Sequence, residues 1–115
     1  MAIIIAGSIK VPADKREYLL TASRDHIVAS RAEPGCEYYD WAADLAEPEV
    51  IQVFELWTDE ASLAEHFAGK PYISTVQLIA DTCEVVEADI SKYRVDLREP
   101  VYDRDGKPRA DFFTA

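Results

Sequence analysis

The chain has 115 residues, 49% hydrophobic and 30% charged, a composition typical of one small globular domain. Its 22 acidic side chains outnumber the 12 basic ones and give a formal net charge of −10 at pH 7. A surface of that charge repels phosphate backbones and argues against nucleic-acid binding. No apolar run approaches the ~20 residues that a membrane-spanning helix needs, so we expect no membrane partner.

The first elements along the chain are predicted to be a strand and a helix. Residues Ile3 to Ile9 are apolar and mostly β-branched, and their lack of polar alternation predicts a strand buried on both faces. Pro12 suits the first turn of a helix, and apolar residues at helical spacing carry that helix to about Ala29 or Ser30. The N-terminus has no basic region typical of a signal peptide, which favours a cytoplasmic protein.

A hairpin of two strands is predicted next. The turn Glu33 to Gly35 ends the first helix, and Cys36 to Ala42 follows as a strand. Alternation along that strand places Tyr38 on one face and Tyr39 on the other. After a short loop, Val50 to Trp57 is rich in β-branched and aromatic residues and forms the third strand.

The second half of the domain repeats the order of helix and strand. Thr58 or Asp59 caps a helix that Gly69 and Pro71 end, and a further turn or two is expected from Tyr72 to Asp81. Cys83 to Tyr93 is the predicted fourth strand.

The resulting order, β-α-β-β-α-β, predicts an α+β fold, a ferredoxin-like sandwich with two helices over one mostly antiparallel sheet. Residues 1–93 form this domain, and 94–115 form a C-terminal extension. Phe112 and Phe113 near its end are too apolar to remain in water, so we expect the extension to pack on the domain or on the partner subunit. A sheet covered on one face only also predicts a homodimer.

Two residues are candidates for proton transfer. His66 lies at the edge of the helix face that should look at the sheet, and imidazole exchanges protons near neutral pH. A half-buried, purely structural histidine is the alternative. Glu55 lies mid-strand among apolar residues, where a carboxylate needs a partner. It is either a tuned base or a structural acceptor.

The remaining candidates are aromatic. Trp57 and Tyr72 are expected to form walls of a cleft, and Tyr38 is a weaker candidate for its lining. Cys36 has no base beside it in sequence and is not expected to be a nucleophile. With two histidines, no clustered cysteines and no glycine-rich cofactor motif, the sequence predicts neither a metal site nor a cofactor.

Two blocks of sequence resemble a known family. Arg31-Ala32-Glu33-Pro34-Gly35-Cys36-Glu37-Tyr38 is similar to the r-x-E-x-G-C-x-x-Y signature of the antibiotic biosynthesis monooxygenase (ABM) domain. Phe54-Glu55-Leu56-Trp57, followed by Ala61, Leu63, Ala64 and His66, resembles that family's E-x-W … a-l-x-x-H block. The resemblance covers about residues 3 to 92.

The resemblance implies a ferredoxin-like fold that pairs through its sheets into a dimeric α/β barrel. It also implies a cofactor-independent monooxygenase that oxidises a small aromatic dihydroxy compound of the quinol type with O₂. On that reading His66 handles protons, held by Glu55, while Trp57, Tyr72 and Tyr38 bind the ring. The alternatives are an isomerase or detoxifying enzyme for a small oxygenated metabolite, and a non-catalytic dimeric module that binds a ligand.

Haem-degrading relatives offer a further comparison. They use an asparagine on the first strand, a tryptophan on the central helix and a haem-binding histidine beyond it. This chain contains no asparagine, has His66 where that tryptophan would fall, and has no histidine after it. Haem degradation is therefore disfavoured.

Overall fold

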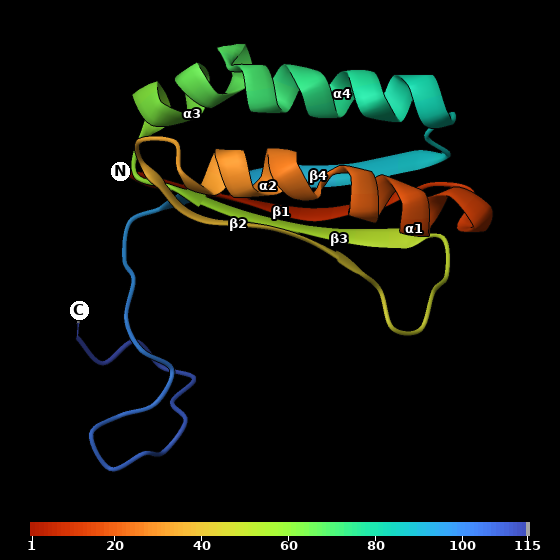
Figure 1. Cartoon of the computed structure of the whole chain (residues 1–115). Coiled ribbons are helices and arrows are strands. Elements are labelled where there is room, and N and C mark those ends of the chain that lie inside the picture. Colours follow the sequence, from red (N-terminus) through yellow and green to blue (C-terminus); the bar gives the residue numbers. More distant parts are fainter. Residues whose placement is uncertain (115) are drawn as a thin grey trace.

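A computed structural model describes residues 1–114 as one domain followed by an extended tail (Figure 1). In chain order the elements are β1 (Ala2–Lys10), α1 (Ala13–Ala22), α2 (Arg24–Arg31), β2 (Cys36–Ala43), β3 (Val50–Trp57), α3 (Glu60–Ala68), α4 (Lys70–Thr82) and β4 (Glu87–Val95). The strands form one sheet in the order β2-β3-β1-β4, and every neighbouring pair is antiparallel. The predicted ferredoxin-like α+β fold is confirmed, with each of its two helices divided into two segments.

The first division is slight. The backbone N–H of Ser23 still donates to the carbonyl of Leu19, and that of Ile27 donates to Ser23. Ser23 keeps a right-handed helical conformation with a ψ of −11°, which bends the chain between α1 and α2. The predicted helix therefore ends close to where it was expected, at Arg31, with one bend in it.

The second division is sharper and corrects the predicted length of α4. Gly69 is the single residue between α3 and α4, and its extended backbone turns the chain. Pro71 lies in the first turn of α4, where a missing N–H costs nothing, and so begins this helix instead of merely ending α3. The helix continues to Thr82, and Cys83 caps it, so β4 begins at Glu87 and not at Cys83 as predicted.

All four helices cover the same face of the sheet (Figure 1). The core lies between the two layers. Its buried apolar side chains form one cluster of Ile3, Ile5, Tyr39, Trp57 and Leu63 and a second of Ile9, Val11, Leu19 and Ile51. Alternation along β1 sends Ile3, Ile5 and Ile9 into this core, while Ile4 on the opposite face is only half-buried. The prediction that β1 is buried on both faces is thus wrong for the single chain.

The opposite face of the sheet, which we call the open face, carries large exposed apolar side chains. Tyr38, Phe54 and Tyr93 are 57%, 41% and 55% exposed, and the rings of Tyr38 and Phe54 meet edge to face with centroids 6.1 Å apart. These three side chains stay exposed within residues 1–114.

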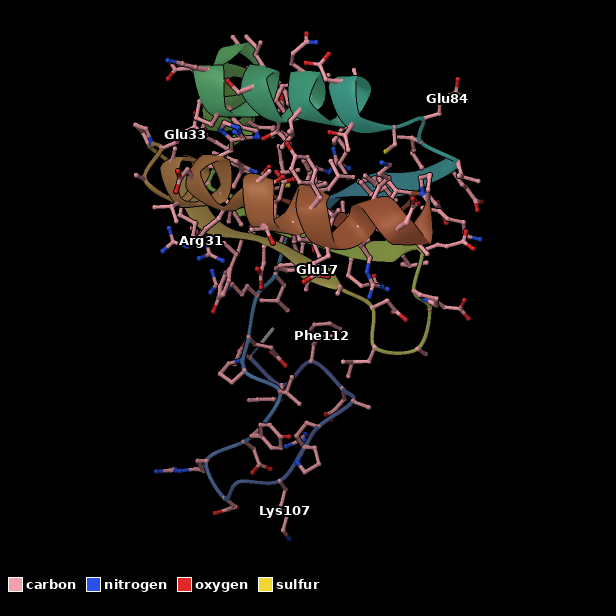
Figure 2. All side chains as sticks on the ribbon, turned by 45° about the vertical axis from the view of Figure 1, so that its right-hand side comes forward. Glu17, Arg31, Glu33, Glu84, Lys107 and Phe112 are labelled. Atoms are coloured by element: carbon pink, nitrogen blue, oxygen red, sulfur yellow. The ribbon has the colours of Figure 1, made fainter. Side chains whose placement is uncertain are left out.

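The C-terminal tail leaves the end of β4 and extends on the side of the open face, away from the helices (Figures 1 and 2). It is folded on itself: Tyr102 pairs with Pro108 across a turn, and the carboxylate of Glu99 accepts hydrogen bonds from the backbone of Phe113 and Thr114. Its ion pair with the domain joins Arg98 to Glu37 at 3.1 Å. Packing of the tail on a partner subunit stays a prediction.

Candidate functional site

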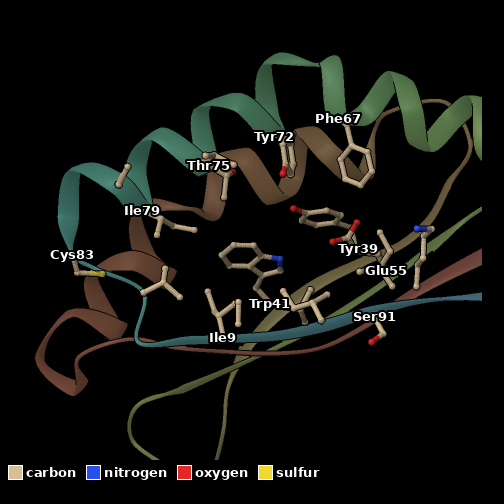
Figure 3. Close-up of a pocket in the computed structure, with 18 residues that line it drawn as sticks. Ile9, Tyr39, Trp41, Glu55, Phe67, Tyr72, Thr75, Ile79, Cys83 and Ser91 are labelled. Atoms are coloured by element: carbon tan, nitrogen blue, oxygen red, sulfur yellow. The ribbon is translucent and has the colours of Figure 1, made fainter.

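A cavity of about 720 Å³ lies between the sheet and α4 (Figure 3). Its floor comes from the inward-facing residues of all four strands, and its roof comes mainly from α4 with Phe67 of α3. The lining is mostly apolar and aromatic, which suits a small flat organic molecule. The polar exceptions with ionisable side chains include Glu55, Tyr39 and Lys92.

Those three residues belong to one row across the sheet. Glu55 of β3 pairs in register with Tyr39 of β2 on one side and with Ile5 of β1 on the other, and Ile5 in turn pairs with Lys92 of β4. Because partners in register point to the same face, all four side chains point toward the helices. The row therefore places a carboxylate and an ammonium group on either side of Ile5.

Glu55 is buried at the cavity wall, with 6% of its surface exposed. Trp57 lies two residues further along β3, on the same face, and its indole Nε1 donates a hydrogen bond of 2.9 Å to Oε1 of Glu55. Burial raises the pKa of Glu55 above its ordinary value, and the bond from Trp57 and, whenever its ring is protonated, the positive charge of His66 oppose that rise. A carboxylate with a raised pKa is suited to take a proton from a weakly acidic group.

His66 lies directly behind Glu55 and is almost completely buried, at 1% exposure. Its ring packs against the indole of Trp57 and the phenols of Tyr39 and Tyr72, with centroids 4.5, 5.4 and 5.4 Å away. It does not line the cavity itself.

The two ring nitrogens of His66 have different surroundings. Nδ1 lies 2.6 Å from Oε1 of Glu33, a carboxylate oxygen that accepts the Nδ1 proton. Nε2 lies 4.0 Å from Oε1 of Glu55, and among residues 1–114 it has no hydrogen-bond partner. The neighbours thus assign the proton of the neutral ring to Nδ1 and leave the lone pair of Nε2 facing Glu55.

The structure places the predicted site residues in three groups. Glu55 and Tyr72 line the cavity, while His66 and Trp57 stand behind its wall in contact with Glu55 and Tyr72. Tyr38 lies on the open face, so the prediction that it lines the cleft is wrong. Strand alternation correctly separated it from its neighbour on β2, but alternation alone does not say which face meets the helices.

Three residues of the site were not identified from the sequence. Tyr39 takes the place in the cavity expected for Tyr38. Glu33 was assigned to a turn and belongs to the first block that resembles the family, but no periodicity relates it to His66, 33 positions later. Lys92 was overlooked because β4 was recognised from its apolar residues; its inward position follows only from the register with Ile5.

Cysteine and metal chemistry are not indicated by the described residues. Burial raises the pKa of Cys36 to about 11, and the charges of Glu55 and Glu33 add to the rise. The thiol is therefore protonated at neutral pH and is a poor nucleophile, as expected. Within residues 1–114 no group of three or more His, Cys, Asp and Glu side chains is arranged to hold a metal ion. None of the helices in the same range has the length and apolar character for crossing a membrane.

Sequence comparison links the chain to one family. The model of the family described as "Antibiotic biosynthesis monooxygenase" matches residues 2–77. An uncharacterized protein of Synechocystis sp. is 42% identical over 93 residues, 81% of this chain and 63% of the relative, so the chain spans just under two thirds of that protein. The Bacillus subtilis protein named "Putative monooxygenase YcnE" is 29% identical, with 84% of this chain and 99% of that protein covered.

Solved structures agree on the fold. A conserved protein from Methanosarcina mazei is 26% identical and superposes with a TM-score of 0.72 over 82% of this chain and 92% of its own. A protein from Deinococcus radiodurans superposes more closely, with a TM-score of 0.76 over 90% of this chain and all of its own. Its identity is only 19%, so it supports the fold alone.

Proposed function

The chain belongs to the antibiotic biosynthesis monooxygenase family, and on that premise we propose that it oxidises a small aromatic dihydroxy compound with O₂ and without a cofactor. The observation that carries the proposal is the cross-strand row in which Glu55 and Lys92 face one apolar cavity from either side of Ile5. In such a row Glu55 can deprotonate an aromatic hydroxyl, and the ammonium group of Lys92 can stabilise the resulting anion.

The cavity suits an aromatic ring. Tyr72, Phe67 and Trp41 offer aromatic faces or edges around a space of about 720 Å³ (Figure 3). The indole Nε1 of Trp41 is buried without a hydrogen-bond partner among residues 1–114. Because a buried donor is costly when unpaired, a hydroxyl or carbonyl oxygen of the substrate would be favoured beside it.

The two charged side chains of the site have different roles in substrate activation. Glu55, with its raised pKa, takes the proton of a substrate hydroxyl. Lys92 forms no ion pair with a carboxylate within residues 1–114, which leaves its ammonium group available for the anion. Lys92 is exposed on the edge strand β4, so its charge would stabilise a developing anion from the solvent-exposed rim of the cavity.

The anion itself is the reductant. A deprotonated quinol is electron-rich and donates electrons to O₂; a ring carbon forms a C–O bond to give a hydroperoxide. Loss of water from that hydroperoxide breaks the O–O bond and leaves a hydroxyquinone. The balance is quinol plus O₂ to hydroxyquinone plus water, so one oxygen atom enters the product and no outside electrons are needed.

His66 and Trp57 support this chemistry from behind the wall. The indole of Trp57 fixes the carboxylate of Glu55 in place by its hydrogen bond. His66 packs against the rings of Trp57 and Tyr72 and offers an unpaired Nε2 toward Glu55. It is proposed to handle protons through Glu55 and not by touching the substrate.

A homodimer through the open face completes the proposal. The exposed side chains of Tyr38, Phe54 and Tyr93 form an apolar surface that a second sheet would bury. The tail projects on that same side, with Phe112 66% exposed, and would reach around the partner (Figures 1 and 2). Two sheets joined in this way form the dimeric α/β barrel that the family resemblance implies.

The test is oxygen uptake by the purified protein with a panel of benzenediols, naphthalenediols and anthrones. The matched variant is Glu55→Gln, which keeps the shape of the side chain and its acceptor oxygen for Trp57 but cannot take a proton. Wild type should consume O₂ with at least one of these compounds, and Glu55→Gln should be slower by roughly 10²-fold or more. Conversion of a small metabolite without O₂ uptake would support an isomerase instead, and binding without any conversion would support a ligand-binding module.

A further inference from the structure

We propose that Glu33, His66 and Glu55 form a relay that carries protons between the cavity and the solvent, with Glu33 as its outer end. The relay deepens the proposed function, on which it rests for the origin of the proton. What the relay adds is a role for Glu33, which lies outside the cavity and 33 positions before His66 in the chain.

The three groups form a continuous path from the inside to the outside. The exposed fractions of the side chains are 8% for Glu55, 1% for His66 and 20% for Glu33. Oε1 of Glu55 faces Nε2 of the imidazole at 4.0 Å, and Oε1 of Glu33 lies 2.6 Å from Nδ1 on the other side of the ring. A buried base at the cavity wall is thus connected to a carboxylate that water can reach.

The position of Glu33 is fixed by its surroundings. It lies in the turn between α2 and β2, where its backbone N–H donates to Ser30 and its carbonyl accepts from Cys36. Oε2 of its carboxylate lies so close to Gly69 that a Cβ at that position would approach it to 2.9 Å. Glycine at the junction of α3 and α4 therefore leaves room for the carboxylate beside His66.

A purely structural histidine explains less of this arrangement. Such a residue usually satisfies both ring nitrogens, because an unpaired buried polar atom costs free energy. Here Nε2 is buried, unpaired within residues 1–114 and directed at the one carboxylate that lines the cavity. Under the proposed function, Glu55 must pass on the proton that it takes from the substrate. The unpaired Nε2 of His66 is placed to accept that proton.

The transfer changes only O–H and N–H bonds. Glu55, protonated by the substrate, gives its proton to Nε2 of His66 while Nδ1 gives its own proton to Glu33, which releases it to water. The reverse sequence returns a proton for the loss of water from the hydroperoxide. Because 4.0 Å exceeds hydrogen-bond length, Glu55 and the ring must approach by about 1 Å for the inner step.

Of the other titratable groups around His66, Tyr39 and Cys36 do not offer a second path. Tyr39 packs against the ring from β2, and burial raises its pKa well above the ordinary range, so it stays protonated. Cys36, at the start of β2, is likewise protonated at neutral pH. Tyr72 approaches the ring from α4. The carboxylates that reach the imidazole nitrogens are Glu33 and Glu55.

The test is the exchange of the His66 Nδ1 proton with water, measured by NMR on protein with ¹⁵N-labelled histidine. In wild type, Nδ1 should carry the proton and Nε2 should not. Glu33→Gln keeps an oxygen to accept the hydrogen bond but removes the group that takes the proton. The relay predicts that exchange becomes slower in this variant by about 10-fold or more. A purely structural hydrogen bond predicts the opposite sign, because the neutral amide is a weaker acceptor and the proton would exchange faster.

Controls separate the relay from general effects of charge. Glu65→Gln removes one negative charge from the exposed side of α3, next to His66 in sequence, and should leave the exchange rate unchanged. If Glu33→Gln does not fold, Glu33→Asp, which withdraws the carboxylate by one methylene, replaces it and should also slow exchange. Unchanged or faster exchange in the Glu33 variant overturns the relay, as does a wild-type ring protonated at Nε2.

Oxygen uptake distinguishes failure of the relay from failure of the proposed function. If a quinol is oxidised, Glu33→Gln should lower kcat by about 10-fold with little change in KM, because Glu33 does not touch the substrate. If no quinol is oxidised by wild type but exchange is slowed in Glu33→Gln, the proposed function fails and the relay stands. If a quinol is oxidised and kcat of Glu33→Gln is unchanged, the relay fails and the proposed function stands.

Discussion

The indole of Trp57 holds the carboxylate of Glu55 by a hydrogen bond of 2.9 Å at the wall of a mostly apolar cavity. Both side chains come from β3 and point to the same face because they are two residues apart. The bond favours the ionised form of Glu55 and partly offsets the rise in its pKa that burial causes. The reactivity of the proposed base therefore depends on an aromatic neighbour.

Trp57→Phe should shift the pH profile of the enzyme toward alkaline pH. Loss of the indole donor removes an interaction that lowers the pKa of Glu55, so this pKa rises further. Because a base acts in its ionised form, the ascending limb of kcat/KM against pH should move to higher pH, and activity at the lower end should fall. The measurement is that profile for wild type and variant. An unmoved ascending limb would mean that Glu55 is not the group that titrates.

His66→Ala should lower both stability and activity. The ring is fully buried against Trp57, Tyr39 and Tyr72, so its removal leaves a hole in the core. A loss of roughly 2–5 kcal/mol in unfolding free energy is expected, as for other large-to-small core changes. Activity per folded molecule, measured well below the melting temperature, should fall by roughly 10²-fold. Full activity of the folded fraction would remove His66 from proton handling.

The fold was accessible from the sequence because its signals are local. The apolar runs of β1 and β3, Asp59 as the cap of α3, and the order of elements led directly to the ferredoxin-like arrangement. Pro71 was misleading, since the same residue can follow one helix or begin the next. The end of α3 at Gly69 was predicted, but α4 is longer than the turn or two expected from Tyr72 to Asp81, because it begins at Lys70 and continues to Thr82.

The site was accessible only in part, because its relationships are long-range. Glu55 and His66 were selected for their chemistry in an apolar setting, and the structure brings them within 4.0 Å. Glu33 reaches His66 through the packing of a turn on a helix junction, and Lys92 reaches the cavity through the pairing of the first and last strands. Neither contact has a counterpart in local sequence patterns.

Lys92→Met should weaken handling of the substrate anion. The variant keeps much of the length and apolar stem of the side chain but removes the charge at the end of the row that begins at Glu55. We expect kcat/KM for a quinol to fall by about 10- to 100-fold. Lys107→Met, which removes a charge from the distant tail, is the matched control (Figure 2). Equal kinetics for the two variants would exclude Lys92 from the site.

The proposed dimer can be tested by light scattering at micromolar concentration, which should give about twice the chain mass of 12.9 kDa. Phe54→Asp places a charge in the middle of the open face and should produce monomers. Val28→Asp is the matched control, because Val28 is similarly exposed, at 49%, but lies on α2. If the tail packs on the partner subunit, removal of residues 97–115 should weaken the dimer. A wild-type monomer would contradict the barrel.

The central claim is that one atom of O₂ enters the aromatic product through a substrate anion formed at Glu55. Its most direct test is turnover under ¹⁸O₂ of whichever quinol first shows uptake, with the product analysed by mass spectrometry and hydrogen peroxide assayed in parallel. The account predicts one ¹⁸O atom in each hydroxyquinone, one O₂ consumed per product, no hydrogen peroxide, and at least a 10²-fold slower reaction with Glu55→Gln. Unlabelled quinone with stoichiometric hydrogen peroxide, or labelled product formed equally fast by Glu55→Gln, would contradict it.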